Sequence, residues 1–343
     1  MLRANLIAPT RVVLEEAPEP TPGPGEVRLR IETCGVCGSD IHAYYGEHPF
    51  IDLPVQPGHE FVGEIDALGP GVAGWSVGQR VTAEPSLVCG ECAQCRAGRY
   101  NICERLRVIG CQSDGALAEY LVVPAAKLVE IPDGMTNEQG AMIEPLAVGV
   151  HAMRLAALTP ATRLLILGAG TIGLTALLAA RAQGVTDITI TDTVPAKLDL
   201  ARELGAKHAV NVGATDLADF CRATFGAERA FDVAAECVGV EATVRDAINT
   251  LKKGGALVIV GVFGHEVKVN LGLVQDRELR LIGSLMYTMD DFLTARNLIA
   301  SGRAPVTKLI TGRYPLGQIG AAMQFIDQQR AHNIKTMIHI RPQ

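Results

Sequence analysis

The chain has 343 residues, of which 48% are hydrophobic, 20% are charged and only 4% are aromatic, and its formal net charge is −6. The apolar fraction excludes a disordered chain, and the acidic balance makes nucleic acid a poor partner. The sequence contains no 18-residue apolar run free of charged residues and helix breakers, which disfavours a membrane protein. The length predicts about two domains, each with enough chain for a large core.

The first part of the chain, up to about residue 150, predicts an irregular β unit. Short strand-like runs are bounded by glycine or proline, and no internal repeat or low-complexity segment occurs among them. The predicted strands are 27–31, 61–65, 80–81 and 120–123. Short strands separated by long segments favour a barrel-like sheet with long loops.

A different pattern begins near residue 160, where strand-like runs alternate with helical stretches. The predicted strands are 163–167, 187–191, 209–211, 231–235, 256–260 and 279–284, and the predicted helices are 171–183, 195–204, 217–225 and 241–251. This alternation indicates an α/β fold with a doubly wound parallel sheet. The tail has a predicted helix at 290–300 and a strand at 336–340, and we expect it to return to the first domain. The expected domains are therefore 1–148, 149–284 and 285–343.

A G-x-G-x-x-G motif stands where the first strand of this second block meets its helix. A dinucleotide needs this context, because the free N–H groups at a helix start favour its phosphates. Gly168 permits a tight turn, Gly170 lets the backbone approach the pyrophosphate, and Gly173 lets helix and strand pack closely. Without a ligand the motif would be only a glycine-rich turn. The expected cofactor-binding residues are Gly168, Gly170, Thr171, Ile172, Gly173 and Asp192.

Asp192 stands at the end of the second strand of the same block. An acidic side chain there can accept hydrogen bonds from the hydroxyls of the adenosine ribose, and its charge would repel a 2′-phosphate. No arginine directly follows it, so the sequence favours NAD over NADP. The alternative is an ordinary solvated aspartate at a strand end.

Four of the nine cysteines lie within fifteen residues, at positions Cys89, Cys92, Cys95 and Cys103. The N-terminal residues show no secretory pattern, so we expect a reducing cytoplasm, where clustered cysteines hold metal more often than they form disulfides. Four thiolates without an open position make a closed, structural zinc site. An iron–sulfur cluster is the competing interpretation, because it also takes four thiolates.

A second set of metal-binding residue types consists of Cys37, His59 and Glu60. Cysteine, histidine and carboxylate together can hold a metal ion and leave one position open for water or substrate. Spacing alone leaves open that these residues are simply packed and bind nothing.

The order of these motifs resembles that of the zinc-dependent medium-chain alcohol dehydrogenases over essentially the whole chain. The sequence carries Gly35-Val-Cys37-Gly-Ser39-Asp40-Ile-His42, then Gly-His59-Glu60, the four cysteines, Ile143-Glu144-Pro-Leu and the glycine motif. Ser39 after the cysteine, and Glu60 together with Glu144, look most like the sorbitol (polyol) dehydrogenase branch. The resemblance implies a GroES-like irregular β-barrel catalytic domain joined to a Rossmann domain.

The resemblance also implies roles for the matching residues. Cys37, His59 and Glu60 would ligate a catalytic zinc, and Glu144 would coordinate the same ion or hold its water. Ser39 would hydrogen-bond the substrate hydroxyl and begin a proton relay that ends at His42. The four cysteines would hold a structural zinc, which makes one catalytic and one structural Zn²⁺ per chain.

The expected activity is hydride transfer from a secondary alcohol of a polyol or sugar derivative to NAD, which gives a ketone. Sugar-acid (aldonate) or L-threonine 3-dehydrogenase activity is the alternative within the family. Met286-Tyr287 stands where sorbitol dehydrogenases carry Arg-Tyr, which puts sorbitol itself in doubt. We expect a small-molecule alcohol substrate, no nucleic-acid or membrane partner, and a homo-oligomer, a tetramer rather than a dimer. The residues expected to line the substrate pocket are Tyr44, Tyr45, Phe50 and Gln112, with Cys111 nearby.

Two other interpretations lie outside this activity. A zinc-free reductase of enones or quinones with the same fold would lack the set of Cys37, His59 and Glu144, which this chain keeps. A nucleotide-binding protein without enzymatic activity would have no need of Ser39 or of an open metal site beside the cofactor.

Overall fold

The computed structural model describes residues 1–329 and 331–341. Contacts divide the chain into two compact units. The first unit contains Met1–Glu144, Thr288–Ala300 and the chain from Val306 onward, and the second contains Pro145–Tyr287 and Ser301–Pro305. Among the described helices, none combines the length and the apolar character that crossing a membrane requires.

A seven-stranded sheet forms the centre of the first unit, with the order β16-β17-β3-β4-β5-β9 and β8 paired to β3. Strand β3 (Glu26–Val36) alternates with period two: Val27, Leu29 and Ile31 are fully buried, while the arginines between them reach the surface. The other strands are β4 (Glu60–Leu68), β5 (Arg80–Ala83), β8 (Tyr120–Pro124), β9 (Leu128–Glu130), β16 (Ile310–Pro315) and β17 (Lys335–His339). Because β17 pairs with β3, the end of the chain lies in the same sheet as its beginning.

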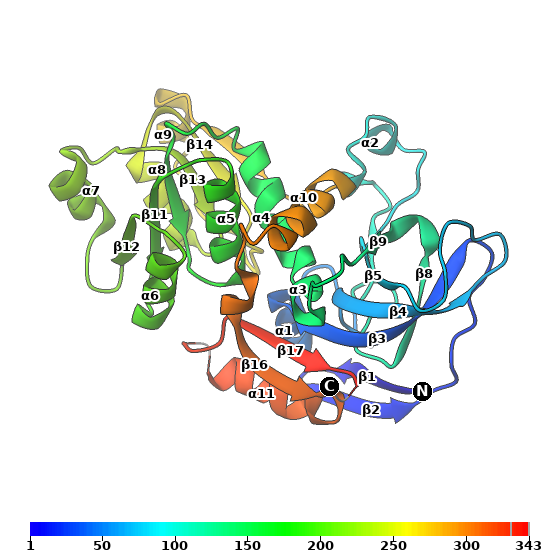
Figure 1. Ribbon diagram of the computed structural model, residues 1–343. Coiled ribbons are helices and arrows are strands. Elements are labelled where there is room, and N and C mark those ends of the chain that lie inside the picture. The colour runs from blue at the N-terminus through cyan, green and yellow to red at the C-terminus, as the bar shows by residue number, and fades with distance from the viewer. Residues whose placement is uncertain (330, 342–343) are drawn as a thin grey trace. The chain divides into compact units, whose positions relative to one another are not determined.

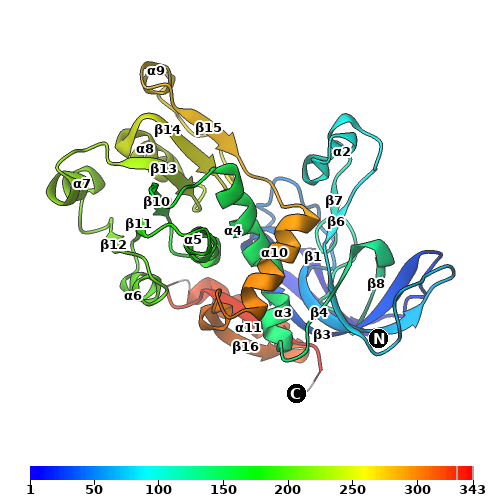
Figure 2. The same cartoon turned by 45° about the horizontal axis from the view of Figure 1, so that its top comes forward.

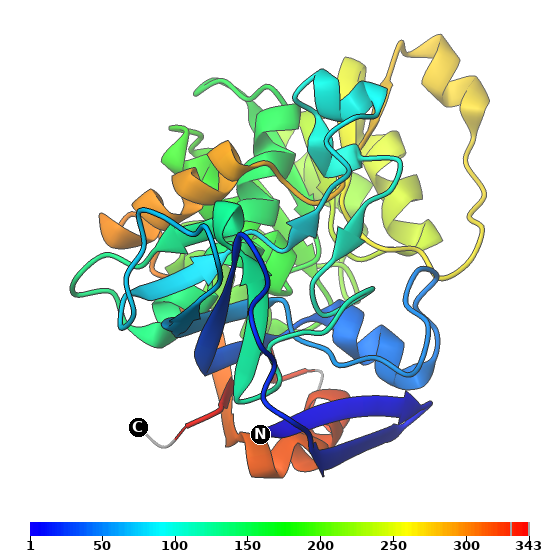
Figure 3. The same ribbon diagram turned by 90° about the vertical axis from the view of Figure 1, so that its right-hand side faces the viewer.

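Smaller elements surround this sheet. Strands β1 (Leu2–Ala8) and β2 (Arg11–Glu16) form a hairpin, and helix α11 (Ile319–Gln328) contacts β2, as Figure 3 shows in dark blue and orange-red. Strands β6 (Ser86–Leu87) and β7 (Arg107–Val108) pair at the base of the four-cysteine segment. The remaining helices are α1 (Gly38–Tyr45), α2 (Ala93–Arg96), α3 (Asn137–Ala141) and α10 (Met289–Ala300), with 3₁₀ turns at Tyr100–Ile102, Ala125–Lys127, Val306–Leu309 and Leu316–Gln318. The sequence patterns predicted neither the hairpin nor α1, α3 and α11.

The second unit is a six-stranded parallel sheet of order β12-β11-β10-β13-β14-β15. Its strands are β10 (Arg163–Leu167), β11 (Asp187–Asp192), β12 (His208–Asn211), β13 (Phe231–Glu236), β14 (Leu251–Ile259) and β15 (Arg280–Gly283). Its helices are α5 (Thr171–Ala182), α6 (Pro195–Glu203), α7 (Leu217–Phe225), α8 (Glu241–Thr250) and α9 (Leu271–Asp276), and helix α4 (Ile143–Leu155) precedes β10 (Figures 1 and 2). The predicted alternation of strands and helices is confirmed.

The strand order of this sheet reverses at β10, because β11 lies on one side of it and β13 on the other. In open α/β sheets, ligands bind beyond the carboxyl ends of the strands at such a point. Strand β14 begins at Leu251, earlier than the predicted strand, because the residues that end the predicted helix already pair with β13.

Candidate active site

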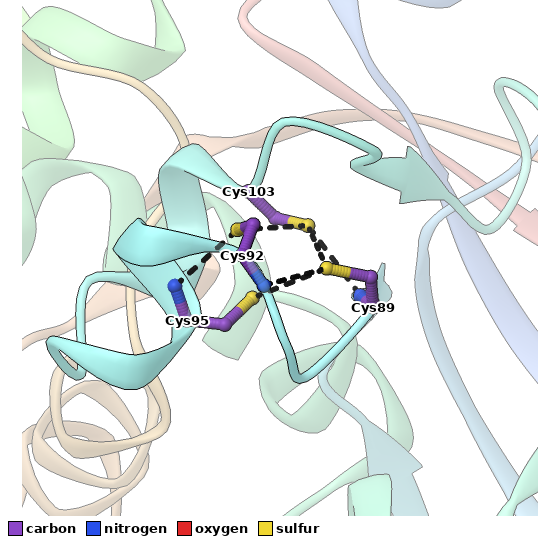
Figure 4. Close-up of side chains that lie close together, drawn as sticks. All are labelled: Cys89, Cys92, Cys95 and Cys103. Carbon is purple, nitrogen blue, oxygen red and sulfur yellow. Dashed lines mark hydrogen bonds between the residues drawn. The ribbon is translucent and has the colours of Figure 1, made fainter.

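The four clustered cysteines lie on a loop of the first unit, and their sulfur atoms face one another (Figure 4). Cys89 Sγ lies 3.5 Å from Cys103 Sγ and 3.9 Å from Cys95 Sγ, and Cys92 Sγ lies 4.0 Å from Cys103 Sγ. Ligands at about 2.3 Å from one tetrahedral zinc ion are about 3.8 Å apart, so these thiols fit a single ion. A cluster of several irons would hold its cysteines farther apart, because each iron takes its own thiolates.

Backbone N–H groups point at these sulfur atoms. Those of Cys92 and Cys95 lie 3.3 and 3.5 Å from the Sγ atoms of Cys89 and Cys92, and that of Arg105 lies 3.3 Å from Cys103 Sγ. The N–H groups of Glu91 and Cys92 lower the pKa of Cys89 to about 6. The loop thus stabilises thiolate, which is the form of cysteine that binds metal.

The four-cysteine loop is fastened to the first unit through Tyr100. Its hydroxyl accepts the backbone N–H of Met289, at the start of α10. Lys127 Nζ lies 4.9 Å from the centre of the Tyr100 ring and 2.7 Å from the buried carboxylate of Glu84. Burial, and then the charge of Glu84, raise the pKa of Tyr100, so its hydroxyl keeps its proton at neutral pH.

The second set of predicted ligands also comes together. One donor atom each of Cys37, His59 and Glu60 lies within 4.8 Å of the others. Cys37 is the N-cap of α1, while Glu60 is the first residue of β4 and His59 directly precedes it. Gly58 has a φ of +106°, and a Cβ there would lie 2.8 Å from Cys34 Sγ and from a backbone nitrogen, so glycine is required just before His59.

Asp40 is a polar partner of this cluster that the sequence analysis did not assign. It is 1% exposed, and its Oδ2 accepts the Cys37 N–H at 2.8 Å. Its Oδ1 faces His59 Nδ1 at 3.8 Å, an electrostatic contact that is too long for a hydrogen bond. A negative charge facing Nδ1 favours the proton on that nitrogen, which leaves Nε2 for a metal ion. Burial lowers the pKa of His59, but Asp40, Cys111 and Cys37 together outweigh it and raise that pKa well above its usual value.

Lys335 is the second residue that sequence reasoning missed. It is 2% exposed, and its Nζ donates to the two carboxylate oxygens of Glu60 at 2.6 and 2.7 Å and to Val36 O at 3.0 Å. Burial lowers the pKa of Lys335, but Glu60, Cys37 and Glu144 outweigh this and raise it. No local pattern could have indicated this contact, because Lys335 lies at the opposite end of the chain from Glu60.

Two of the other predicted catalytic residues lie on α1, the helix that Cys37 caps. Ser39 and His42 lie one turn apart on α1, directly after Cys37, and the His42 and His48 ring centres are 6.5 Å apart. Glu144 is buried in the first turn of α4, where its charge acts on Lys335. The group of donor atoms within 4.8 Å contains Glu60 and not Glu144.

A pocket of about 460 Å³ lies in the first unit, and Cys111 is the lining residue that connects it to the cluster. Cys111 lines it, and its Sγ lies 4.0 Å from His59 Nδ1. Phe50 and Gln112 line it as well, and Gln112 Nε2 donates to Phe50 O at 2.7 Å. Tyr44, by contrast, is buried in the core of the unit, with Tyr45 packed against that core.

The glycine motif lies between β10 and α5 in the second unit. Gly168 has a φ of +98°, and a Cβ on Gly173 would lie 1.8 Å from Gly168 O, so the protein's own packing requires both glycines. A Cβ on Gly170 would meet no atom within 4 Å. Packing therefore does not explain Gly170, whereas a phosphate group approaching the backbone does. Thr171 and Ile172 form the first turn of α5.

The carboxylates of Asp192 and Glu236 order the turns beside this motif. Asp192 Oδ2 accepts the Ala169 N–H at 2.8 Å, which ties the end of β11 to the glycine loop. Glu236, which sequence reasoning missed, is fully buried at the end of β13. Its Oε1 accepts from Val238 N, Gly239 N and Thr243 Oγ1 at 2.8–2.9 Å. These hydrogen bonds hold the adjacent loops after β10, β11 and β13 in place, where a ligand would bind.

Comparison with known proteins assigns both units to described families. Residues 23–133 match the alcohol dehydrogenase GroES-like domain, and residues 171–301 match the zinc-binding dehydrogenase family. L-galactonate-5-dehydrogenase of Escherichia coli is 35% identical over 311 residues, which is 91% of this chain and 91% of that protein. Sorbitol dehydrogenase of Bacillus subtilis is 33% identical and covers 98% of this chain and 97% of its own.

The solved structures give the same result. A zinc-binding dehydrogenase from Sinorhizobium meliloti, bound to NADP, has a TM-score of 0.92 to this chain and 33% sequence identity, with 98% of each chain covered. These likenesses span the whole chain, as the order of the motifs predicted, and they join a sugar-acid enzyme and a polyol enzyme at nearly equal identity.

Proposed function

The chain belongs to the zinc-dependent alcohol dehydrogenase family, and on that premise we propose that it oxidises a secondary alcohol of a polyol to a ketone with NAD. The balanced reaction is R₂CHOH + NAD⁺ → R₂C=O + NADH + H⁺. The observation that carries this proposal is the convergence of Cys37, His59 and Glu60, since this donor set leaves a position open where four cysteines would close it.

We assign the catalytic zinc to Cys37, His59 and Glu60, and Glu144 would coordinate the same ion or hold its water. We assign the structural zinc to the four-cysteine loop. When bound, zinc polarises the alcohol oxygen and the nicotinamide ring accepts the hydride. Ser39 Oγ would accept the hydrogen bond of the substrate hydroxyl and, as it takes that proton, would release its own hydroxyl proton through the nicotinamide ribose to the His42 ring, the outer end of the relay.

NAD rather than NADP follows from Asp192, whose carboxylate lies at the glycine loop and would repel a 2′-phosphate. The experiment is to measure kcat/KM with both cofactors for the wild type and for Asp192→Asn. We expect NAD to be preferred and the variant to shift the NADP-to-NAD ratio upward by about tenfold, which is 1.4 kcal/mol. Asp199→Asn, an exposed aspartate of α6, is the matched control. Equal use of both cofactors by the wild type would contradict the assignment.

A polyol rather than a sugar acid is favoured by the charges of the pocket beside Cys111. Asp52 and Asp114 line it, and the one cation among its lining residues, Arg3, is already paired to Glu15 at 2.8 Å. Two carboxylates without a free cation repel the carboxylate of an aldonate and accept hydrogen bonds from neutral hydroxyls. Sugar-acid oxidation remains the second candidate, because L-galactonate-5-dehydrogenase is among the relatives.

A substrate panel separates these candidates. Initial rates are measured with hexitols and pentitols, with aldonates and with L-threonine, for the wild type, Asp114→Asn and the control Asp133→Asn. We expect polyols to have the highest kcat/KM, and Asp114→Asn alone to improve the aldonates by a few fold, as befits one exposed charge. Aldonates preferred by the wild type would overturn the polyol assignment, and a preference for L-threonine would transfer it to the amino-acid branch.

We further propose that the enzyme acts in the cytoplasm as a homo-oligomer, with a tetramer as the expected form. Strand β15 supports an assembly, because it is an edge strand of the six-stranded sheet with Leu281 37% exposed, and Leu285 just beyond it is 52% exposed. Light scattering of the purified protein tests the state, and a monomer at micromolar concentration would contradict it.

A further inference from the structure

Lys335 is the only buried lysine or arginine among the residues that the structure describes. An ammonium group has three N–H donors, and Lys335 uses all of them within 3.0 Å, two on Glu60 and one on Val36 O. The ammonium group therefore has no rotational freedom left. Its position fixes that of the Glu60 carboxylate, which is itself 1% exposed.

Gly35 leaves the space that the Glu60 carboxylate occupies. Gly35 lies opposite Glu60 in the β3–β4 ladder, and a Cβ on it would lie 2.1 Å from Glu60 Oε2. Any larger side chain would displace the carboxylate. Three neighbouring strands, β17, β3 and β4, thus supply the lysine, the glycine and the glutamate, so the sheet itself determines where the carboxylate lies.

The anionic groups around Lys335 outnumber its single positive charge. Glu60, Cys37 and Glu144 all act on its ammonium group, and Asp40 is also within electrostatic reach of it. One fixed cation therefore faces several anionic groups that a metal ion would also attract. Negative charge that the lysine ammonium neutralises attracts a metal ion held by Cys37 and His59 less strongly.

We propose that Lys335 is a positioning residue that divides the charge of Glu60 between its own ammonium group and the catalytic metal, and so weakens Glu60 as a ligand. This inference rests on the proposed function, because it takes Cys37 and His59 as metal ligands. It explains why a carboxylate with both oxygens bound to a lysine also stands within 4.8 Å of the cysteine and histidine donors. Removal of the lysine charge would give the whole charge of Glu60 to the metal.

The test uses the full-length enzyme with Co²⁺ at the catalytic site, so that coordination is seen by visible absorption without turnover. Lys335→Met is expected to change the Co²⁺ spectrum and to slow the removal of this ion by a chelator by about tenfold, within the range that partners of metal ligands produce. Lys335→Arg, which keeps the charge and can hold both oxygens, is expected to preserve the spectrum and the rate. A residue that only supported the fold would act in the opposite direction, with faster metal loss.

Further variants keep the inference testable if Lys335→Met does not fold, since breaking a buried ion pair costs about 3–5 kcal/mol. Lys335→Gln removes the charge but keeps an amide that can donate to Glu60, and it should show the same spectral change as Lys335→Met. Glu60→Gln combined with Lys335→Met removes both charges, and its metal should leave faster than that of the single lysine variant. An unchanged spectrum in the lysine-to-neutral variants, or faster metal loss from them, would overturn the inference. If the Cys37→Ser variant instead contained as much metal as the wild type, the proposed function would be overturned.

Discussion

The four-cysteine loop and the cluster of Cys37, His59 and Glu60 bring their donor atoms to similar separations by opposite routes. The loop takes all its ligands from positions 89–103 and orients them by local turns and backbone N–H groups. The cluster takes its ligands from a helix N-cap and the start of β4, and Lys335 joins it from the last strand. The loop is therefore a separable unit, whereas the cluster depends on the whole sheet.

The surroundings of the two sites differ as well. Three of the four loop cysteines are only half-buried, and their sulfur atoms are stabilised mainly by backbone N–H groups, with the exposed Arg105 beside Cys89. His59 and Glu60 are buried, and charged side chains, Asp40 and Lys335, hold them. A half-buried site whose sulfur atoms accept mainly backbone N–H groups suits a permanent ion. A buried site with charged partners can adjust how strongly its metal acts on a substrate, because the effective dielectric constant is lower there.

Replacement of a cluster ligand should produce the largest effect. Cys37→Ser is expected to lower kcat/KM by about 1,000-fold or more, because the several kcal/mol that a metal supplies correspond to that factor. Metal analysis should show one zinc per chain in the variant and two in the wild type, with an unchanged far-ultraviolet circular dichroism spectrum. Cys34→Ser, a buried cysteine of β3 outside the cluster, is the control and should retain both ions. A variant that kept full activity would disprove the assignment of Cys37.

Replacement of a loop ligand should affect stability rather than chemistry. Cys103→Ser is expected to remove the other zinc and to lower the melting temperature by several degrees, because a structural zinc contributes folding free energy directly. The activity per remaining folded molecule should fall much less than in Cys37→Ser. Equal losses of activity in the two variants would show that the loop and the cluster are not separable.

Removal of metal from the wild type should distinguish the sites by rate. Three protein ligands with an open position release an ion faster than four thiolates, so a chelator is expected to remove the two ions in two phases. Activity should disappear with the first phase, while the melting temperature should fall with the second. Readdition of Zn²⁺ after the first phase alone should restore activity. A single phase, or loss of stability before loss of activity, would contradict this order.

The attachment of the loop should give the smallest effect. Tyr100→Phe removes the hydroxyl that accepts the Met289 N–H but keeps the ring beneath Lys127. We expect about 1 kcal/mol of lost stability, a typical value for one hydrogen bond, and unchanged zinc content. Tyr120→Phe is the matched control, because its ring faces Arg28 and keeps that contact without the hydroxyl. Zinc loss from Tyr100→Phe would mean that the loop depends on its attachment.

Features that are local in the chain were accessible to sequence reasoning. The strand–helix alternation of the second unit is set by apolar periodicity within about ten residues, and the glycine motif by turn and packing requirements that Gly168 and Gly173 meet directly. Features that depend on distant pairs were not accessible. The hairpin of β1 and β2 carries only weak alternation, and α11 gains its stability from packing on β16, β17 and that hairpin.

By itself, the sequence determined the fold class, the four-cysteine loop and the dinucleotide motif, because each results from short-range geometry. Only the tertiary structure decided which carboxylate stands with Cys37 and His59, that Asp40 faces His59 Nδ1, and that Lys335 holds Glu60. The physical reason is that these contacts form between strands and a helix terminus that are adjacent in the sheet and remote in the chain. The spacing of these residues in the sequence therefore gives no indication of the contacts, although these residues carry most of the charge of the site.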